Sequence, residues 1–311
     1  MRNTFVAFGL TVALSACDGF PVAGTDTLAE PSVEETQPAF QLRTAESFEI
    51  EARFERVEAN LLARGLLRAD GGGPDVPFTD EMVARNFTAL AFSEEFSGRG
   101  GRLVRISRES TLHRWDKPIL IETVVGPSVD ADQAIKDTAA VAAFGARLAR
   151  TTGHPIRSVE DGGNFQVFVL NDQELRRSGP QLTNLMPEIS PAQVRFVEQM
   201  SPDTYCVVFT SDPNQDGKIQ RAAAVIRAEL PDRLRTSCIH EEISQGLGLA
   251  NDSAQARPSI FNDDDEFGRL TNHDELLLQI LYDPRLTPGM DRAAAAPLVR
   301  DIATGLISPA T

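Results

Sequence analysis

Residues 240–252 read HEEISQGLGLAND, and this stretch decides which fold and which chemistry the chain is expected to have. Ile243, Leu247 and Leu249 give it an apolar side, so we predict a helix over residues 235–250 that packs against a core. The polar positions are Glu241, Glu242, Gln245 and Asn251. They fit either a solvated helix face followed by a glycine-containing helix end, or the polar lining of a cleft.

The spacing of these polar residues resembles the metzincin zinc-peptidase signature, His-Glu-x-x-His-x-x-Gly-x-x-His. Glu241, Gln245 and Asn251 stand at the three histidine positions, and Glu242 keeps the position of the catalytic glutamate. Gly248 keeps the position of the glycine at which the helix ends and the chain turns back. The resemblance implies a binding cleft that contains Glu241, Glu242, Gln245, Asn251 and the neighbouring His240. Glu242 is catalytic in this reading only if the domain is active.

Two later segments fit the same resemblance. Residues 258–261, Pro-Ser-Ile-Phe, resemble the Ser-Ile-Met turn beneath the metal in this superfamily, with Phe261 in place of Met. Residues 270–282 resemble the helix that closes such catalytic domains, and Thr271 is its predicted N-cap. The run over residues 112–290 also looks like an uncharacterised domain-of-unknown-function family of Gram-negative exported proteins, grouped with zincin-like peptidases. That family carries Glu-Glu-x-x-Gln as its own pattern and brings no activity with it.

The residues that stand in place of the three histidines argue against a zinc site. Catalytic zinc is usually held by three protein ligands, mostly imidazole or carboxylate, whereas the amide oxygens of Gln245 and Asn251 are weak donors. We therefore expect no metal and no cofactor at this motif, and Glu242 has no zinc-bound water to activate. A register shifted by one residue, starting at His240, places Ser244 at the second histidine position and does not restore the motif.

Two acidic segments raise the question of calcium. Residues 212–219 imitate the start of an EF-hand loop, but the twelfth position is Ala223 instead of a bidentate Glu, which favours a hairpin turn. Residues 262–266, Asn-Asp-Asp-Asp-Glu, are typical of a solvated loop, with cation binding as the alternative. Calcium remains the less favoured reading of both segments.

The first 17 residues predict export. Arg2 precedes an apolar run over residues 4–14, and residues 14–17, Leu-Ser-Ala-Cys, resemble the lipobox cut by the lipoprotein signal peptidase. The resemblance implies a signal peptide over residues 1–16, lipidation of Cys17, and a membrane-anchored protein that faces the periplasm. An ordinary secretory signal with an incidental cysteine is the alternative, and the choice between inner and outer membrane stays open.

The rest of the chain predicts an α/β (α+β) fold in which a metzincin-like mixed sheet packs on an active-site-type helix, with extra N-terminal helices. We expect a flexible tether over residues 17–46, the domain over residues 47–290, and a C-terminal helix and tail over residues 291–311. Predicted strands cover residues 112–125, 165–170, 205–209 and 219–227, and predicted helices begin near Ser47, Thr79, Asp130 and Pro191. In an oxidising compartment Cys206 and Cys238 are expected to form a disulfide, with two buried thiols as the alternative.

Composition limits the partners. The formal net charge is −15 and the pI is near 4.8, which argues against nucleic acid because phosphate binding needs clustered Lys and Arg. We therefore expect a cell-envelope lipoprotein whose zinc-free domain is a binding or scaffolding module for a peptide or a cell-wall glycan. The alternative is a peptidase-like hydrolase that uses Glu241 and Glu242, with or without an unusual metal.

Overall fold

The computed structural model describes residues 43–99 and 102–307, except for the side chains of residues 94–107. The predicted signal peptide, the predicted lipidation site Cys17 and most of the predicted tether lie outside the described residues. Nine helices are assigned within the described ranges. They are α1 (Ala45–Ala63), α2 (Asp80–Ala91), α3 (Ala131–Thr152), α4 (Asp172–Leu175), α5 (Gly179–Leu185), α6 (Pro191–Glu198), α7 (Asp232–Gln245), α8 (Asn272–Leu281) and α9 (Arg292–Ile307).

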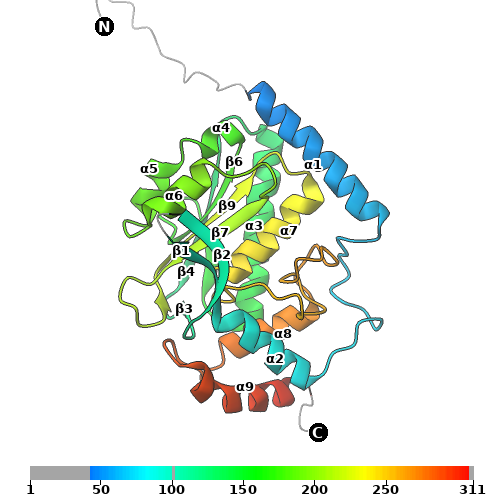
Figure 1. Cartoon of the computed structure of the whole chain (residues 1–311), viewed down its shortest axis with the longest axis vertical. Helices are drawn as coiled ribbons and strands as arrows, with labels where there is room; N and C mark the ends of the chain where they lie inside the picture. The colour runs from blue at the N-terminus through cyan, green and yellow to red at the C-terminus, as the bar shows by residue number, and fades with distance from the viewer. Residues whose placement is uncertain (1–42, 100–101, 308–311) are drawn as a thin grey trace, which may run out of the picture. The chain divides into compact units, whose positions relative to one another are not determined.

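A five-stranded mixed sheet forms the centre (Figure 1). Its strands, in spatial order, are β5 (Ile156–Val159), β4 (Ile119–Val125), β6 (Phe165–Leu170), β9 (Arg221–Arg227) and β7 (Cys206–Ser211). The first four are parallel, and β7 pairs antiparallel with β9 at the edge, with Val208 opposite Ala224. The predicted mixed α/β architecture is confirmed.

Two small sheets lie outside this sheet. One is the antiparallel hairpin of β1 (Ser93–Arg99) and β2 (Arg102–Glu109), and the other pairs β3 (Arg114–Trp115) in parallel with β8 (Lys218–Ile219). The strand predicted over residues 112–125 is therefore two strands, β3 and β4. Pro118 precedes the second strand, and a proline cannot donate a ladder hydrogen bond.

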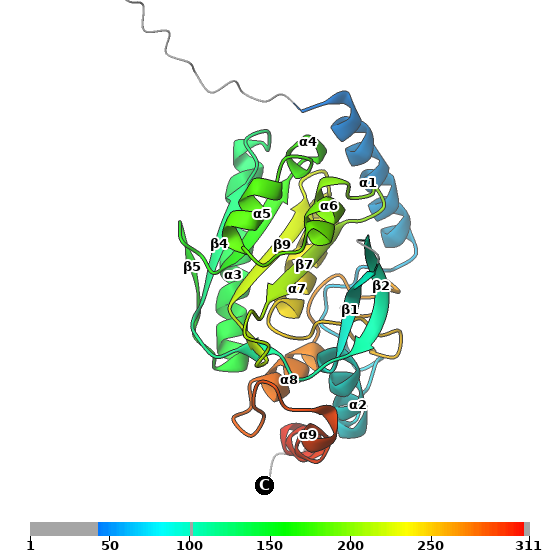
Figure 2. The same ribbon diagram turned by 60° about the vertical axis from the view of Figure 1, so that its left-hand side comes forward.

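Helices cover both faces of the five-stranded sheet (Figure 2). One core cluster joins α3, α7 and α8 to the face that carries Ile121, Val167 and Ala224. A smaller cluster joins α5 and α6 to the opposite face, which carries Phe168 and Val225. Because β6 and β9 are buried on both faces, their sequences are mostly apolar runs instead of strict alternations of apolar and polar residues.

Local capping signals explain several helix starts. The side chains of Thr79, Asp130 and Thr271 cap α2, α3 and α8 at the predicted positions. Helix α1 begins at Ala45, inside the segment predicted as tether, and buries Ile50 and Phe54. Over residues 43–99 and 102–307, no helix combines the length and the apolar character that a membrane span requires.

The helix predicted over residues 235–250 has different ends in the structure. It is α7, which starts at Asp232 and stops at Gln245, five residues early. The chain turns at Gly248, where φ is +129° and a Cβ atom would lie 2.1 Å from the carbonyl oxygen of His113. Glycine is required there because the backbone conformation and the close approach both exclude a side chain.

Candidate functional site

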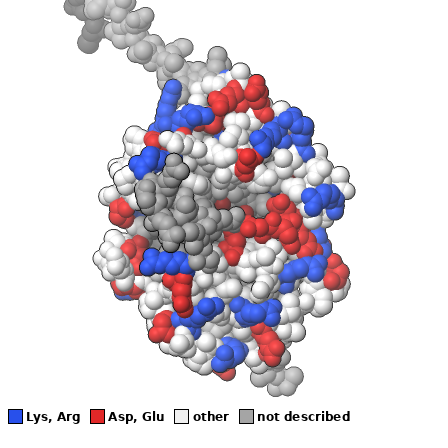
Figure 3. Space-filling model, in the orientation of Figure 1, with Lys and Arg blue, Asp and Glu red and all other residues white. Residues whose placement is uncertain are grey.

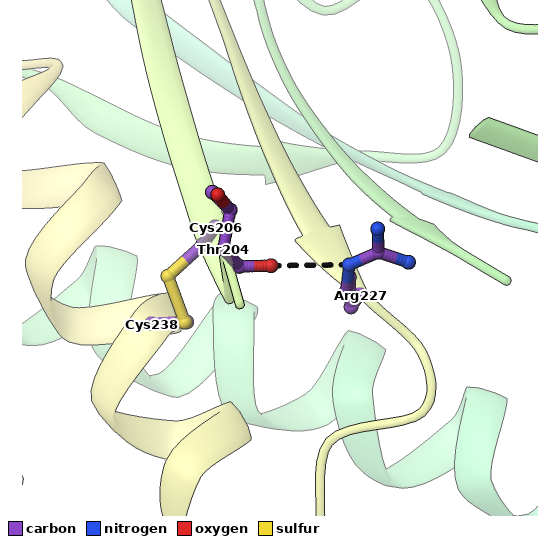
Figure 4. The surroundings of a disulfide bond; sticks show 4 residues. All are labelled: Thr204, Cys206, Arg227 and Cys238. Carbon is purple, nitrogen blue, oxygen red and sulfur yellow. Dashed lines mark hydrogen bonds between the residues drawn. A yellow bond between two sulfur atoms is a disulfide. The ribbon is translucent and has the colours of Figure 1, made fainter. Parts of the chain in front are cut away.

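A disulfide ties α7 to the edge of the sheet. Cys238 in the middle of α7 bonds to Cys206 at the start of β7, with the two Cα atoms 6.0 Å apart (Figure 4). Next to it, the Thr204 carbonyl accepts a hydrogen bond of 3.0 Å from Arg227 Nε at the end of β9. The predicted disulfide is confirmed. It holds α7, the helix that carries the motif residues, against β7, the edge strand of the sheet.

Glu241 and Glu242 lie beside this disulfide. One oxygen of each carboxylate and the Cys206 sulfur lie within 4.8 Å of one another. Glu242 is only 4% exposed, whereas Glu241 is partly exposed. Cys238, Glu241 and Glu242 are spaced i, i+3 and i+4 along α7, so they share the side of the helix that faces Cys206.

The two amides of the predicted cleft are held by the protein itself. Gln245 Nε2 donates to Asp252 Oδ1 at 2.7 Å, and Asn251 Nδ2 donates to the carbonyls of Asp252 (2.8 Å) and Ala89 (3.2 Å). Both side chains are less than a tenth exposed. Because the zinc-ligand positions carry one carboxylate and two internally bonded amides, this donor set does not fit zinc.

Asp252 is a site residue that the motif comparison missed. It follows Asn251 directly and orients the Gln245 amide, although it has no counterpart in the zinc signature. Its acidic side chain next to the last motif position was the only local signal. The polar residues that lie together in the structure therefore include Asp252 in addition to the predicted ones.

His240 points away from this polar group. Its ring stacks on Phe144, with centroids 4.0 Å apart and planes 11° apart, and its Nδ1 accepts from the backbone N–H of Leu270 at 3.1 Å. Burial, with smaller contributions from Arg147 and Arg269, lowers the pKa of His240 to about 3. The imidazole is therefore neutral at ordinary pH, and we assign it to packing instead of the cleft.

A cleft of about 670 Å³ lies at the end of α7 and along the edge strand. Its lining includes Val208, Phe209 and Thr210 from β7, Ser93, Arg108 and Glu109 from the ends of the β1–β2 hairpin, and Gln245 and Gly248 from the end of the site helix. A second hollow of about 290 Å³ continues past Phe209 toward Glu188 and Ile189. The cleft therefore runs beside residues 208–210 of β7 and is also lined by the ends of the two hairpin strands.

A histidine–aspartate pair lines the same cleft. His113 Nε2 lies 3.4 Å from Asp212 Oδ2, and His113 Nδ1 lies 2.8 Å from the Thr111 carbonyl oxygen, which can only accept a hydrogen bond. The Asp212 carboxylate also accepts from the backbone N–H groups of Asp216 and Gly217. Asp212 therefore stabilises the turn that follows β7, which agrees with the hairpin turn predicted for residues 212–219. Nothing local in the sequence pairs His113 with Asp212.

Hydrogen bonds to Ser259 and to Asp274 hold the turn before α8 in place. Phe261 is fully buried, and its N–H donates to Ser259 Oγ at 3.1 Å. Asp274 in α8 accepts from the N–H groups of Ile260 and Thr271, both at 3.0 Å. The segment over residues 258–261 is therefore tied to α8 through Asp274.

Charged side chains of both signs are scattered over the face drawn in Figure 3. Figure 3 shows Lys and Arg side chains dispersed over one face among Asp and Glu, which does not give this face an extended basic surface. In the acidic run over residues 262–266, Glu266 pairs with Arg257 and with Arg68. At least part of this run is therefore neutralised by the protein.

The comparisons with known proteins give one relationship. A family model described as a protein of unknown function (DUF2927) matches residues 80–301, which is most of the chain and includes α2 to β9, α7, the cleft residues and α8. Neither the curated proteins nor the solved structures give a match. The chain therefore belongs to the DUF2927 family.

Proposed function

We propose that this chain is a lipid-anchored binding module of the bacterial envelope that holds an extended segment of a partner polypeptide in the cleft beside β7. The observation that carries the proposal is the position of the cleft along the outer edge of a terminal strand. Exposed strand edges bind extended peptides through main-chain hydrogen bonds, and neighbouring pockets accept alternate side chains.

The hydrogen-bond pattern of β7 supports this choice of partner. The Tyr205 carbonyl accepts from Arg227 N–H, and bonding alternates along an antiparallel ladder. The main-chain groups of residues 205, 207 and 209 therefore face β9, and those of Val208 and Thr210 face outward. Both residues line the cleft, where their N–H and C=O groups can pair with a peptide.

The resemblance to metzincins supports a cleft that binds polypeptide without zinc chemistry. It rests on motif spacing, on the Phe261 turn, and on the position of α7 against a mixed sheet. The side-chain amides of Gln245 and Asn251 are engaged within the protein, so these two residues hold the chain that follows α7 in place. The lipobox resemblance at Cys17 supports the anchor.

The test compares two substitutions at one position of the full chain. Thr210→Pro removes an outward N–H and leaves the ladder to β9 intact, whereas Thr210→Val keeps the N–H and the strand preference. The probe is a reduced and carboxymethylated polypeptide, with soluble peptidoglycan fragments as a second probe. We expect the Pro variant to bind the polypeptide at least about tenfold more weakly and the Val variant to bind it normally. Equal binding by both variants, or binding of the glycan alone, would contradict the proposal.

A hydrolase remains the second candidate because two carboxylates lie close together, one of them buried. Burial can raise the pKa of one member of such a pair, so that it becomes a general acid. In this case, turnover of the carboxymethylated polypeptide or of the peptidoglycan fragments should disappear in Glu242→Gln and persist in Glu55→Gln, which changes an exposed side chain on α1.

A further inference from the structure

Four metal-ligating side chains meet where α7 crosses the start of β7. Cys238, Glu241 and Glu242 come from one side of α7, and Cys206 comes from the strand. The Cys206 sulfur and one oxygen of each carboxylate lie within 4.8 Å of one another, and the Cys238 sulfur is bonded to that of Cys206. Ligands at i, i+3 and i+4 of a helix with one more from a neighbouring element can surround a single ion.

In the disulfide form the two sulfurs cannot act as thiolates, and the thiolate is the form of cysteine that binds metal. We propose that reduction of the Cys206–Cys238 disulfide converts this group into a site for one thiophilic divalent cation, held by two thiolates and two carboxylates. The site shares Glu241 and Glu242 with the metzincin-like motif but uses neither Gln245 nor Asn251, and it adds the two cysteines. The proposal does not depend on peptide binding in the cleft.

The electron and proton balance is simple. A dithiol reductant attacks the sulfur of Cys206, which is partly exposed, and releases the thiolate of Cys238, which is 1% exposed. The second thiol of the reductant then completes its own disulfide, so the protein gains two electrons and two protons. When the cation binds, the two thiol protons leave to solvent.

The ligand set selects the class of cation. Two thiolates favour zinc or its softer analogue cadmium over calcium and magnesium, which prefer oxygen ligands. Tetrahedral zinc with Zn–S and Zn–O bonds of about 2.3 and 2.1 Å brings its ligands to roughly 3.5 Å from one another. The Cys206 sulfur and the two carboxylate oxygens therefore have to approach one another by about 1 Å, whereas the two sulfurs, once reduced, have to move apart from their bonded positions. Side-chain rotation can supply both shifts.

The bound ion would replace the covalent link that it removes. In the disulfide form, the bond holds α7 to β7 next to the cleft. In the reduced form, a cation shared by Cys206 and by the three ligands on α7 keeps the same two elements together. The link between helix and edge strand would thus survive both redox states, with metal required in only one of them.

The test uses the full chain with Cys17→Ala in every sample, so that no third thiol contributes. The oxidised protein and protein reduced with a water-soluble phosphine are titrated with Zn²⁺ against a chromogenic chelator, and with Cd²⁺ by its thiolate charge-transfer absorption. We expect about one equivalent to bind to the reduced protein with thiolate absorption, and none to bind in this way to the oxidised protein. Equal binding in both states overturns the proposal.

Variants separate a four-ligand site from a simple dithiol. In reduced protein with both Glu241→Gln and Glu242→Gln, Zn²⁺ affinity should fall at least about tenfold, whereas the matched pair Glu49→Gln and Glu55→Gln on α1 should leave it unchanged. Unchanged affinity in the first pair overturns the site. Thermal unfolding of the same samples guards against a folding defect: Zn²⁺ should raise the melting temperature of reduced wild type more than that of the Glu241/Glu242 variant.

Discussion

Glu58 caps the site helix at Leu234: its Oε2 accepts from the Leu234 backbone N–H at 3.0 Å, across 176 positions of the chain. The same oxygen accepts from the N–H of Arg233 at 3.0 Å. The helix N-cap is Pro231, whose side chain makes no capping hydrogen bond. Helix α7 therefore takes its N-terminal cap from α1, a helix that lies before the family match over residues 80–301.

Replacing Glu58 with Ala should destabilise the protein by about 1 kcal/mol, because two N–H groups at the start of α7 lose their acceptor and the helix dipole loses a nearby negative charge. Urea denaturation measures the loss. Hydrogen exchange should speed up in the first turn of α7. The control, Glu55→Ala, changes a neighbouring exposed side chain and should alter stability by less than about 0.5 kcal/mol. If the two variants behave alike, the cap does not stabilise α7.

Sequence alone predicts the features of this fold that depend on interactions between residues only a few positions apart. Thr79, Asp130 and Thr271 mark helix starts because each caps N–H groups two or three residues later. The apolar runs that predict β6 and β9 are equally local. The disulfide was predictable for a different reason: if export and lipidation of Cys17 are expected, Cys206 and Cys238 are the two cysteines left to pair.

Contacts between distant segments could not be predicted in this way. Glu58 at α7, Asp212 beside His113 and Phe144 against His240 all join segments that only the folded sheet brings together. His240 is an example. Its position next to the motif predicted a place in the cleft, but in the structure its ring packs on Phe144 of α3. The early end of α7 has the same origin, since the carbonyl that crowds Gly248 belongs to His113.

Gly248→Ala tests that crowding. The new Cβ would lie 2.1 Å from the His113 carbonyl oxygen in a backbone with φ of +129°, so the chain on both sides has to move. We expect a loss of about 3 kcal/mol or more in the free energy of unfolding. Gly305→Ala in α9 is the matched control: a Cβ added there meets no atom within 4 Å, and alanine should stabilise that helix by about 0.5–1 kcal/mol. Similar effects at both glycines would argue against steric exclusion at the turn.

His240 should make the protein sensitive to acid. Its pKa falls from 6.5 in the unfolded chain to about 3 in the folded one, so the unfolded chain alone takes up the proton between these values. The resulting stability is complete above about pH 6.5 and is lost as the pH falls toward 3, with about 2 kcal/mol lost by pH 5. His240→Asn keeps an acceptor for Leu270 N–H and removes the titration. The stability difference between pH 7 and pH 5 should therefore shrink by about 2 kcal/mol, and parallel pH profiles would show that another group is responsible.

Two aspartates allow a comparison of a buried cap with an exposed one. Asp274 is fully buried and accepts from the N–H groups of Ile260 and Thr271, whereas Asp291 is exposed and accepts from the N–H of Ala294 at the start of α9. Asp274→Ala leaves two buried N–H groups without water or protein to bond, so we expect a loss of about 3 kcal/mol. Asp291→Ala exposes its N–H to solvent and should cost about 1 kcal/mol.

Chemical denaturation at neutral pH measures both losses, and the comparison bears on the site as well as on stability. The turn that carries Phe261 is held to α8 through Asp274, so Asp274→Ala should also weaken peptide binding in the cleft if that turn supports the end of α7. Asp291→Ala should leave binding unchanged because α9 contributes no residue to the described cleft lining. Equal losses of stability would mean that Asp274 is hydrated in solution, and the turn would then need another anchor.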